Sequence, residues 1–168
     1  MPMLRLSKIL AVAAVALYAS LVALGNLTDY GSNLAFVQHV LAMDTVFADS
    51  TIRWRALTSP PLQHLAYALI IAAECATALL CWLGAVQLWR RRAAPAARFQ
   101  RAKSVAIAGL TLGFLVWQVG FMSVGGEWFG MWMSTQWNGI EAAFRCFMLI
   151  LGVLIFVSLR DDELPGGD

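Results

Sequence analysis

The most prominent pattern in the chain is a set of four long apolar stretches separated by more polar segments. They cover residues 6–24, 62–89, 104–124 and 139–159. Each approaches or exceeds the length of about 20 residues with which a helix crosses the hydrocarbon core of a bilayer. The stretches lack the alternation of an outer-membrane β-strand, and backbone groups in lipid must form hydrogen bonds within their own segment. The pattern predicts an all-α integral membrane protein, a four-transmembrane-helix bundle that forms one domain over residues 1–168.

The first apolar stretch has two interpretations, because Arg5 and Lys8 stand near its start as in a secretory signal peptide. The apolar run continues to Leu24 without a helix breaker, and no clean Ala-X-Ala cleavage site precedes Asn26. We therefore expect a retained transmembrane helix, with cleavage as the alternative.

Two longer polar segments, 25–61 and 125–138, predict a structured cap at one end of the bundle. The first places Leu34, Val37 and Leu41 at helical spacing, which indicates a short helix with one apolar face. The second carries four aromatic residues within ten positions: Trp128, Phe129, Trp132 and Trp137. Such a cluster forms either an aromatic belt at the level of the lipid headgroups or a surface that binds another molecule.

Composition strengthens the membrane assignment. The chain is 60% hydrophobic and 13% charged, whereas soluble domains are about 45–50% apolar and about 25% charged. A core made from 168 residues is too small to hide this excess. The composition therefore excludes a soluble single domain, a disordered chain and a disulfide scaffold.

The distribution of charge predicts the orientation in the membrane. Segment 90–103 holds six basic residues and no acidic one, two basic residues stand at the N-terminus, and Arg160 follows the last stretch. The positive-inside rule then gives a cytoplasmic basic loop, N-in/C-in topology and an acidic cytoplasmic tail over residues 160–168. We expect a multi-pass protein of the bacterial cytoplasmic (inner) membrane. A nucleic-acid-binding patch is the other interpretation of the loop, but its position between two spans argues against a nucleic-acid partner.

The three cysteines, Cys75, Cys81 and Cys146, all lie inside apolar stretches, and no Cys-X-X-Cys pair or zinc-like spacing occurs. We expect them to be buried small hydrophobic residues and predict no metal site. The chain has only His39 and His64, too peripheral for haem ligation between helices, so we expect no cofactor. Metal or haem binding by the external loops stays open.

The second apolar stretch carries the most polar face in the chain. His64, Tyr67, Glu74 and Cys81 are three or seven residues apart, so they share one face of a helix that should point into the bundle. Glu74 lies about 18 Å beyond Leu62, near the membrane midplane. A carboxylate there costs at least about 2.5–3.5 kcal/mol. Either Glu74 is protonated or it has a partner, and both a functional role and an interhelical hydrogen bond remain open.

The fourth and third stretches add further polar groups. Glu141 and Arg145 are four residues apart, acid first, which favours a local ion pair. The alternative is that Arg145 binds Glu74 across the bundle. Gly109 and Gly113 have the spacing that lets helices approach closely, either within the molecule or against another subunit. Gln118 in the same stretch needs a hydrogen-bond partner.

These observations give two candidate sites. The candidate intramembrane polar site consists of His64, Tyr67, Glu74, Gln118, Glu141 and Arg145. The candidate extracytoplasmic interaction surface consists of Trp54, Trp128, Phe129, Trp132 and Trp137. No catalytic residue is predicted, because the sequence has no GxSxG, HExxH, Walker or GxGxxG motif.

Several segments together resemble a known family. They are HVLAMDTVF, IRWRAL, YALIIAAE and the long run AKSVAIAGLTLGFLVWQVGFMSVGGEWFGMWMSTQWNGIEAAFR. The chain is similar over nearly its whole length to the bacterial "predicted small integral membrane protein" family, a domain of unknown function. The resemblance implies a four-helix inner-membrane protein and transfers no catalytic residue, because it implies no activity.

Two functions fit the sequence. The first is a non-enzymatic accessory or assembly subunit that contacts the lipid bilayer and packs against a larger membrane complex or another copy of itself. The second is a protein that binds or transports a small polar solute, a proton or a lipid through the Glu74 and Arg145 polar face.

Overall fold

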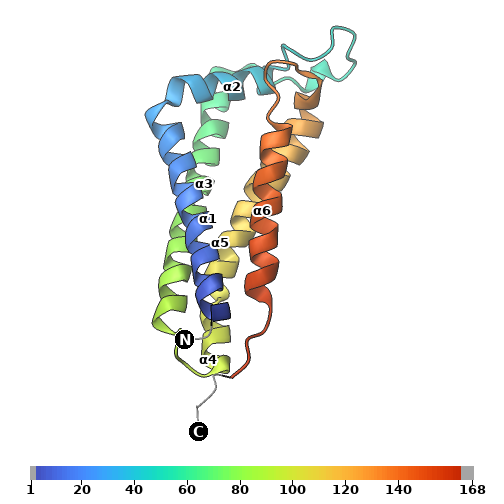
Figure 1. Cartoon of the computed structure of the whole chain (residues 1–168). Helices are drawn as coiled ribbons and strands as arrows, with labels where there is room; N and C mark the ends of the chain where they lie inside the picture. The colour runs from blue at the N-terminus through green and yellow to red at the C-terminus, as the bar shows by residue number, and fades with distance from the viewer. Residues whose placement is uncertain (1–2, 164–168) are drawn as a thin grey trace.

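The computed structural model describes residues 3–163 and is built from helices joined by short loops. Within these residues four helices are long and apolar enough to cross a membrane, which confirms the predicted bundle. The elements in chain order, shown in Figure 1, are α1 (Met3–Thr28), α2 (Tyr30–Ala42), the 3-10 turn η1 (Arg53–Arg55), α3 (Pro60–Arg90), α4 (Ala96–Ala102), α5 (Ser104–Leu115), the π-helical segment η2 (Val116–Trp128), the 3-10 turn η3 (Met131–Met133) and α6 (Ile140–Ser158).

The helices α1 and α3 are longer than the apolar stretches that predict them. Helix α1 runs four residues past Leu24, so Asn26 lies inside it. Helix α3 begins at Pro60, and Pro61 follows in the same first turn. Proline is tolerated there because the amides of a first turn have no partner within the helix. The basic segment 90–103 also contains the short helix α4, so it is more ordered than a simple loop.

Helix α3 lies at the centre of the packing and contacts α1 on one side and α5 on the other. The start of α1 and the end of α6 lie at one end of the bundle, next to α4, and we call this the basic end (Figure 1). Helix α2 lies across the opposite end, which we call the cap end. Four helices long enough to span, with the start of α1 and the end of α6 at the same end of the bundle, agree with the predicted number of spans, while the orientation in the membrane stays a prediction.

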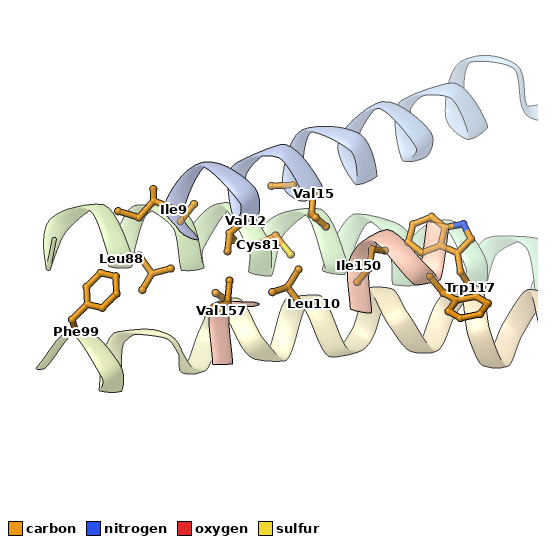
Figure 2. Close-up of a cluster of buried hydrophobic side chains, with 14 of the residues drawn as sticks. Ile9, Val12, Val15, Cys81, Leu88, Phe99, Leu110, Trp117, Ile150 and Val157 are labelled. Carbon is orange, nitrogen blue, oxygen red and sulfur yellow. The ribbon is translucent and has the colours of Figure 1, made fainter. Parts of the chain in front are cut away.

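The main hydrophobic core runs along the length of the bundle. Figure 2 shows Val12 of α1, Leu88 of α3, Leu110 of α5 and Val157 of α6 converging, and the row extends to Trp117. All five side chains are buried. The core therefore joins all four spanning helices.

Glycines set the distance between α3 and α5. A Cβ atom on Gly84 would lie 2.5 Å from the Cα of Ala106, and one on Gly109 would lie 2.8 Å from the backbone nitrogen of Cys81. Gly113 faces the Thr77 side chain in the same contact. The Gly109 and Gly113 face is thus an intramolecular packing face, the first of the two alternatives.

The cap has a small core of its own, to which segments 25–61 and 125–138 both contribute. Val40, Met43 and Val46 pack against Phe129 and Met131. Met43 ends α2 with a φ of 51°, and its amide donates a hydrogen bond to the Val40 carbonyl. The two segments are therefore packed against one another at the cap end.

Replacement of Gly84 by alanine tests the α3–α5 contact. The added methyl meets backbone atoms of Ala106, which cannot rotate away, so we expect a loss of about 1–3 kcal/mol in unfolding free energy. Gly152→Ala is the matched control, because a Cβ there meets nothing within 4 Å and alanine favours helix by up to about 1 kcal/mol. Reversible unfolding in mixed micelles measures both. Equal stabilities for the two variants would contradict the backbone contact.

Candidate functional site

Glu74, halfway along α3, is 1% exposed and is held by α1. The Asn26 side-chain amide donates a hydrogen bond to Glu74 Oε2 at 2.7 Å. The Tyr67 hydroxyl donates to the Asn26 carbonyl at 3.0 Å and lies 3.3 Å from Asn26 Oδ1. Glu74 therefore takes part in an interhelical hydrogen bond. Its second oxygen, Oε1, is buried and has no partner within residues 3–163.

The predicted polar face of α3 points into the bundle for most of its length. Tyr67, Glu74 and Cys81 are all buried, as helical spacing requires for residues on one face. His64 is exposed instead, and its Nδ1 lies 2.9 Å from the Tyr30 hydroxyl. The Tyr30 ring also packs on Tyr67 at 4.8 Å between centroids. His64 thus contacts the start of α2 at the cap end, and Tyr30 lies between it and the buried groups.

A cavity of about 150 Å³ adjoins Glu74 beneath α2. Its polar lining comes from Asn26, Asn33, Tyr67 and Glu74. Its aromatic lining comes from Phe36 of α2 and from Trp117 and Phe121 of η2. Because α1, α2, α3 and η2 each contribute, the cavity exists only in the folded bundle. Of the cavities that the predicted site residues line in the described part of the chain, it has the most polar lining.

Glu141 and Arg145 are both exposed on α6. Among the residues that the structure describes, Arg145 forms no ion pair with Glu141 or with Glu74. An exposed pair at this spacing gives only about 0.2–0.5 kcal/mol, which is too little to fix two flexible side chains. Arg145 lies beside an apolar groove between α1 and α6. The structure therefore separates Arg145 from the polar site around Glu74.

Gln118 and the cysteines differ in part from expectation. Gln118 is half-buried, and its backbone carbonyl accepts a hydrogen bond from the Ser123 hydroxyl. Cys81 is buried and Cys146 is half-buried, but Cys75 is exposed, so the prediction of three buried cysteines is wrong for that residue. Cys75 follows Glu74 directly, and successive helical residues point about 100° apart, so it leaves the inward face.

The predicted aromatic interaction surface divides into exposed and buried parts. Trp54 and Trp128 meet edge to face at the surface, with the Arg55 guanidinium 4.5 Å from the Trp128 ring centre. Trp132 is also exposed and meets Phe47 edge to face at 5.8 Å.

Phe129 and Trp137 belong to the same predicted surface but are more buried than its other members. Phe129 is buried in the cap core, so its assignment to the surface is wrong. It lies at the turn where η2 ends, and it lines a cavity between α2, α3 and η2. Trp137 is half-buried and stacks on His39 with ring centres 4.4 Å apart.

The histidines lie in two separate places. His39 is 2.7 Å from Asp44, and His64 contacts Tyr30. Within residues 3–163 no three His, Cys, Asp or Glu side chains gather as a metal site requires.

The sequence did not predict the buried ionic cluster at the basic end. Asp161, whose side chain is 2% exposed, accepts from Lys8 of α1 at 3.1 Å and also pairs with Lys103. Both ammonium groups donate to the Leu159 carbonyl, at 2.7 Å from Lys8 and 2.6 Å from Lys103. Lys103 also donates to Gln100. The segment after α6 is therefore fixed to the start of α1 and to the α4–α5 junction.

Arg5 extends this cluster to the turn after α3. Its guanidinium donates to the Ala94 carbonyl at 2.6 Å, to the Arg92 carbonyl at 3.2 Å and to the Asp162 carbonyl at 3.1 Å. The same group lies 4.6 Å from the Phe99 ring centre. Part of the charge that indicates orientation thus also stabilises the fold. The predicted acidic tail reaches residue 168, and positions 164–168 lie outside the described residues.

A family comparison covers nearly the whole chain. The profile of the family described as predicted small integral membrane protein (DUF2165) matches residues 4–160. The chain belongs to this family. The match covers the cap and, apart from Met3, all four membrane helices, and it ends one residue before Asp161. No curated protein and no solved structure matches the chain. Membership in the predicted small integral membrane protein family supports the membrane assignment and names no reaction.

Asp161→Asn tests the buried cluster in this family member. The change leaves two buried ammonium groups without their carboxylate, and we expect a loss of about 3–5 kcal/mol in unfolding free energy. Asp162→Asn is the control, because Asp162 is exposed and contributes only its backbone carbonyl to Arg5. Unfolding in mixed micelles measures both variants. A similar stability for Asp161→Asn and Asp162→Asn would show that the cluster contributes nothing.

Proposed function

We propose that the protein is an accessory or assembly subunit of a larger complex in the bacterial inner membrane, without enzymatic activity of its own. In this proposal the groove between α1 and α6 binds a transmembrane helix of a partner protein. The observation that carries it is the position of Arg145, an exposed cation in a membrane-spanning helix.

The groove has the size and surface of a helix-docking site. Helix α6 packs mainly on α5 and η2 and meets α1 at few positions, which leaves a space of about 510 Å³. Ala11 and Ala14 on α1 form one wall, and small residues allow another helix to approach closely. Leu149, which is 72% exposed, lies on the opposite wall.

Arg145 specifies the chemistry of the partner. Its guanidinium stays charged at any physiological pH. Charged side chains within spans normally face a partner of opposite sign, and among the described residues Arg145 has none. We therefore expect the partner helix to carry an aspartate or glutamate near its own end. A lipid phosphate and a second copy of this chain are the occupants that an experiment must distinguish.

Site-specific photocrosslinking tests this proposal in intact cells. Leu149→p-benzoylphenylalanine should give one discrete adduct with a larger membrane protein, which mass spectrometry identifies together with the crosslinked residue. The same substitution at Leu79 is the matched control, because Leu79 is an exposed leucine on α3, away from the groove. Arg145→Glu should abolish the adduct, and the reciprocal acid-to-arginine change on the partner helix should restore it.

Other outcomes would contradict the proposal that an acidic partner helix binds in the groove. A crosslink to lipid alone, or an adduct with twice the mass of this chain, would replace the partner helix with a phospholipid or a second copy. Identical adducts at positions 149 and 79 would show nonspecific membrane contacts. Loss of the adduct in Arg145→Glu without rescue would remove the acidic partner residue from the proposal.

A further inference from the structure

We propose that the cavity beside Glu74 binds the primary ammonium group of a small organic cation. This inference is independent of the proposed subunit role, because it concerns the cavity under α2 rather than the groove between α1 and α6. It assigns Glu74 as the anionic receptor, Asn26 and Tyr67 as the residues that position it, and the aromatic residues as the walls.

The hydrogen bonding of the Glu74 carboxylate is incomplete. Its Oε2 accepts from Asn26, while Oε1 is buried without a partner in the described part of the chain. A buried carboxylate oxygen without a hydrogen-bond donor is unfavourable, because it has lost its contacts with water and gained none in the protein. Among residues 3–163, no Lys or Arg lines the cavity beside it. The site therefore has room for a group that brings both an N–H donor and a positive charge.

The lining of the cavity favours an organic cation over a metal ion. Metal ions such as Na⁺ or Ca²⁺ need a nearly complete shell of oxygen ligands, whereas most of this lining is apolar or aromatic. An organic ammonium suits such walls better, because aromatic faces attract cations and also cover aliphatic carbon. Phe36, Trp117 and Phe121 supply three rings around the cavity.

The volume of the cavity limits the size of the ligand. The cavity of about 150 Å³ equals the volume that holds a benzene-sized ligand in an engineered protein. A second cavity of about 270 Å³ lies between α2, α3 and η2 and shares four lining residues with the first: Phe36, Val37, Ile70 and Phe121. Its lining is apolar apart from backbone groups. An alkyl chain attached to the ammonium would extend in that direction.

The surrounding hydrogen bonds keep Glu74 in position. Asn26 donates its side-chain amide to Glu74, and Tyr67 donates its hydroxyl to Asn26. Asn26 and Tyr67 therefore use these donors to hold Glu74. Within residues 3–163, Glu74 Oε1 is the carboxylate oxygen that has no donor. Asn33, whose amide nitrogen donates to the Asp29 carbonyl, adds a further polar group to the lining.

Calorimetric titration of the purified full chain in detergent tests the inference. The probe is n-butylammonium, and 1-butanol is its neutral analogue of equal heavy-atom number. We expect saturable binding of the ammonium only. Glu74→Gln should weaken it at least about tenfold, because the charged hydrogen bond is lost. Glu141→Gln should leave the affinity unchanged, since it removes an exposed carboxylate from another span.

A second variant keeps the test decisive if Glu74→Gln does not fold. Ile70→Phe retains the carboxylate and fills the wall shared by the two cavities, and it should also abolish binding. The inference is overturned if the ammonium binds no better than 1-butanol, if it does not bind at all, or if folded Glu74→Gln binds it as well as the wild type.

The choice of lipid distinguishes the two possible sources of the ammonium group, a lipid headgroup and a free amine. The same titration is run in nanodiscs of phosphatidylcholine, which has no N–H donor, and in nanodiscs that contain phosphatidylethanolamine. Weaker butylammonium binding in the second lipid means that the headgroup occupies the site. Equal binding in the two lipids means that the ligand is a free amine. Both results support an ammonium receptor at Glu74 and differ only in its natural source.

Discussion

Backbone contact between α3 and α5 sets the geometry of the whole bundle. Helices in a bilayer gain little from hiding apolar side chains, so they associate through close packing and polar contacts. Gly84 and Gly109 allow this approach, and larger side chains there would collide with Ala106 and Cys81. On its other side α3 meets α1, where buried alanines such as Ala19 face inward.

The fourth span does not share this tight packing. Helix α6 presents bulky side chains such as Phe147 and Ile150 to the core, and Gly152 lies in open space rather than at a helix contact. Larger side chains hold α6 farther from α1, so a groove remains between these helices. The same difference in residue size that stabilises α1, α3 and α5 as a unit thus leaves a surface open for another molecule.

Polar contacts at both ends of α1 fix its position along α3. Arg5 donates to carbonyls in the turn after α3, and Asn26 donates to Glu74 in the middle of α3. These two anchors are separated by about 30 Å of helix. A shift of α1 by one residue would break both sets of hydrogen bonds in a medium with little water to replace them. Apolar packing alone would tolerate such a shift far better.

Hydropathy was sufficient to predict the four spans, because a bilayer imposes a minimum apolar length on each. Helical spacing was sufficient to place Tyr67, Glu74 and Cys81 on the inward face of α3. The partner of Glu74 could not be predicted in this way. Asn26 lies beyond the first apolar stretch, and the pair joins residues 48 positions apart through tertiary packing.

The buried cluster of Lys8, Lys103 and Asp161 was missed for a different reason. Basic residues at the ends of spans already have a sufficient explanation in the orientation rule, so nothing in the pattern required a carboxylate beside them. Only the fold shows that the segment after α6 returns to α1. Glu141 and Arg145 show the converse, because favourable spacing did not produce a contact on an exposed surface.

Asp161 provides an internal standard for the state of Glu74. Both carboxylates are nearly inaccessible, at 2% exposure for the Asp161 side chain and 1% for Glu74. Asp161 is compensated by two ammonium groups, whereas Glu74 receives one neutral amide. Within residues 3–163 Asp161 Oδ1 also lacks a partner, so the difference between the sites lies in charge rather than in hydrogen bonds. Where this fold buries a carboxylate for structure, it places cations from its own helices beside it. At Glu74 it places a cavity instead, in which the proposed ammonium group would supply the compensating charge.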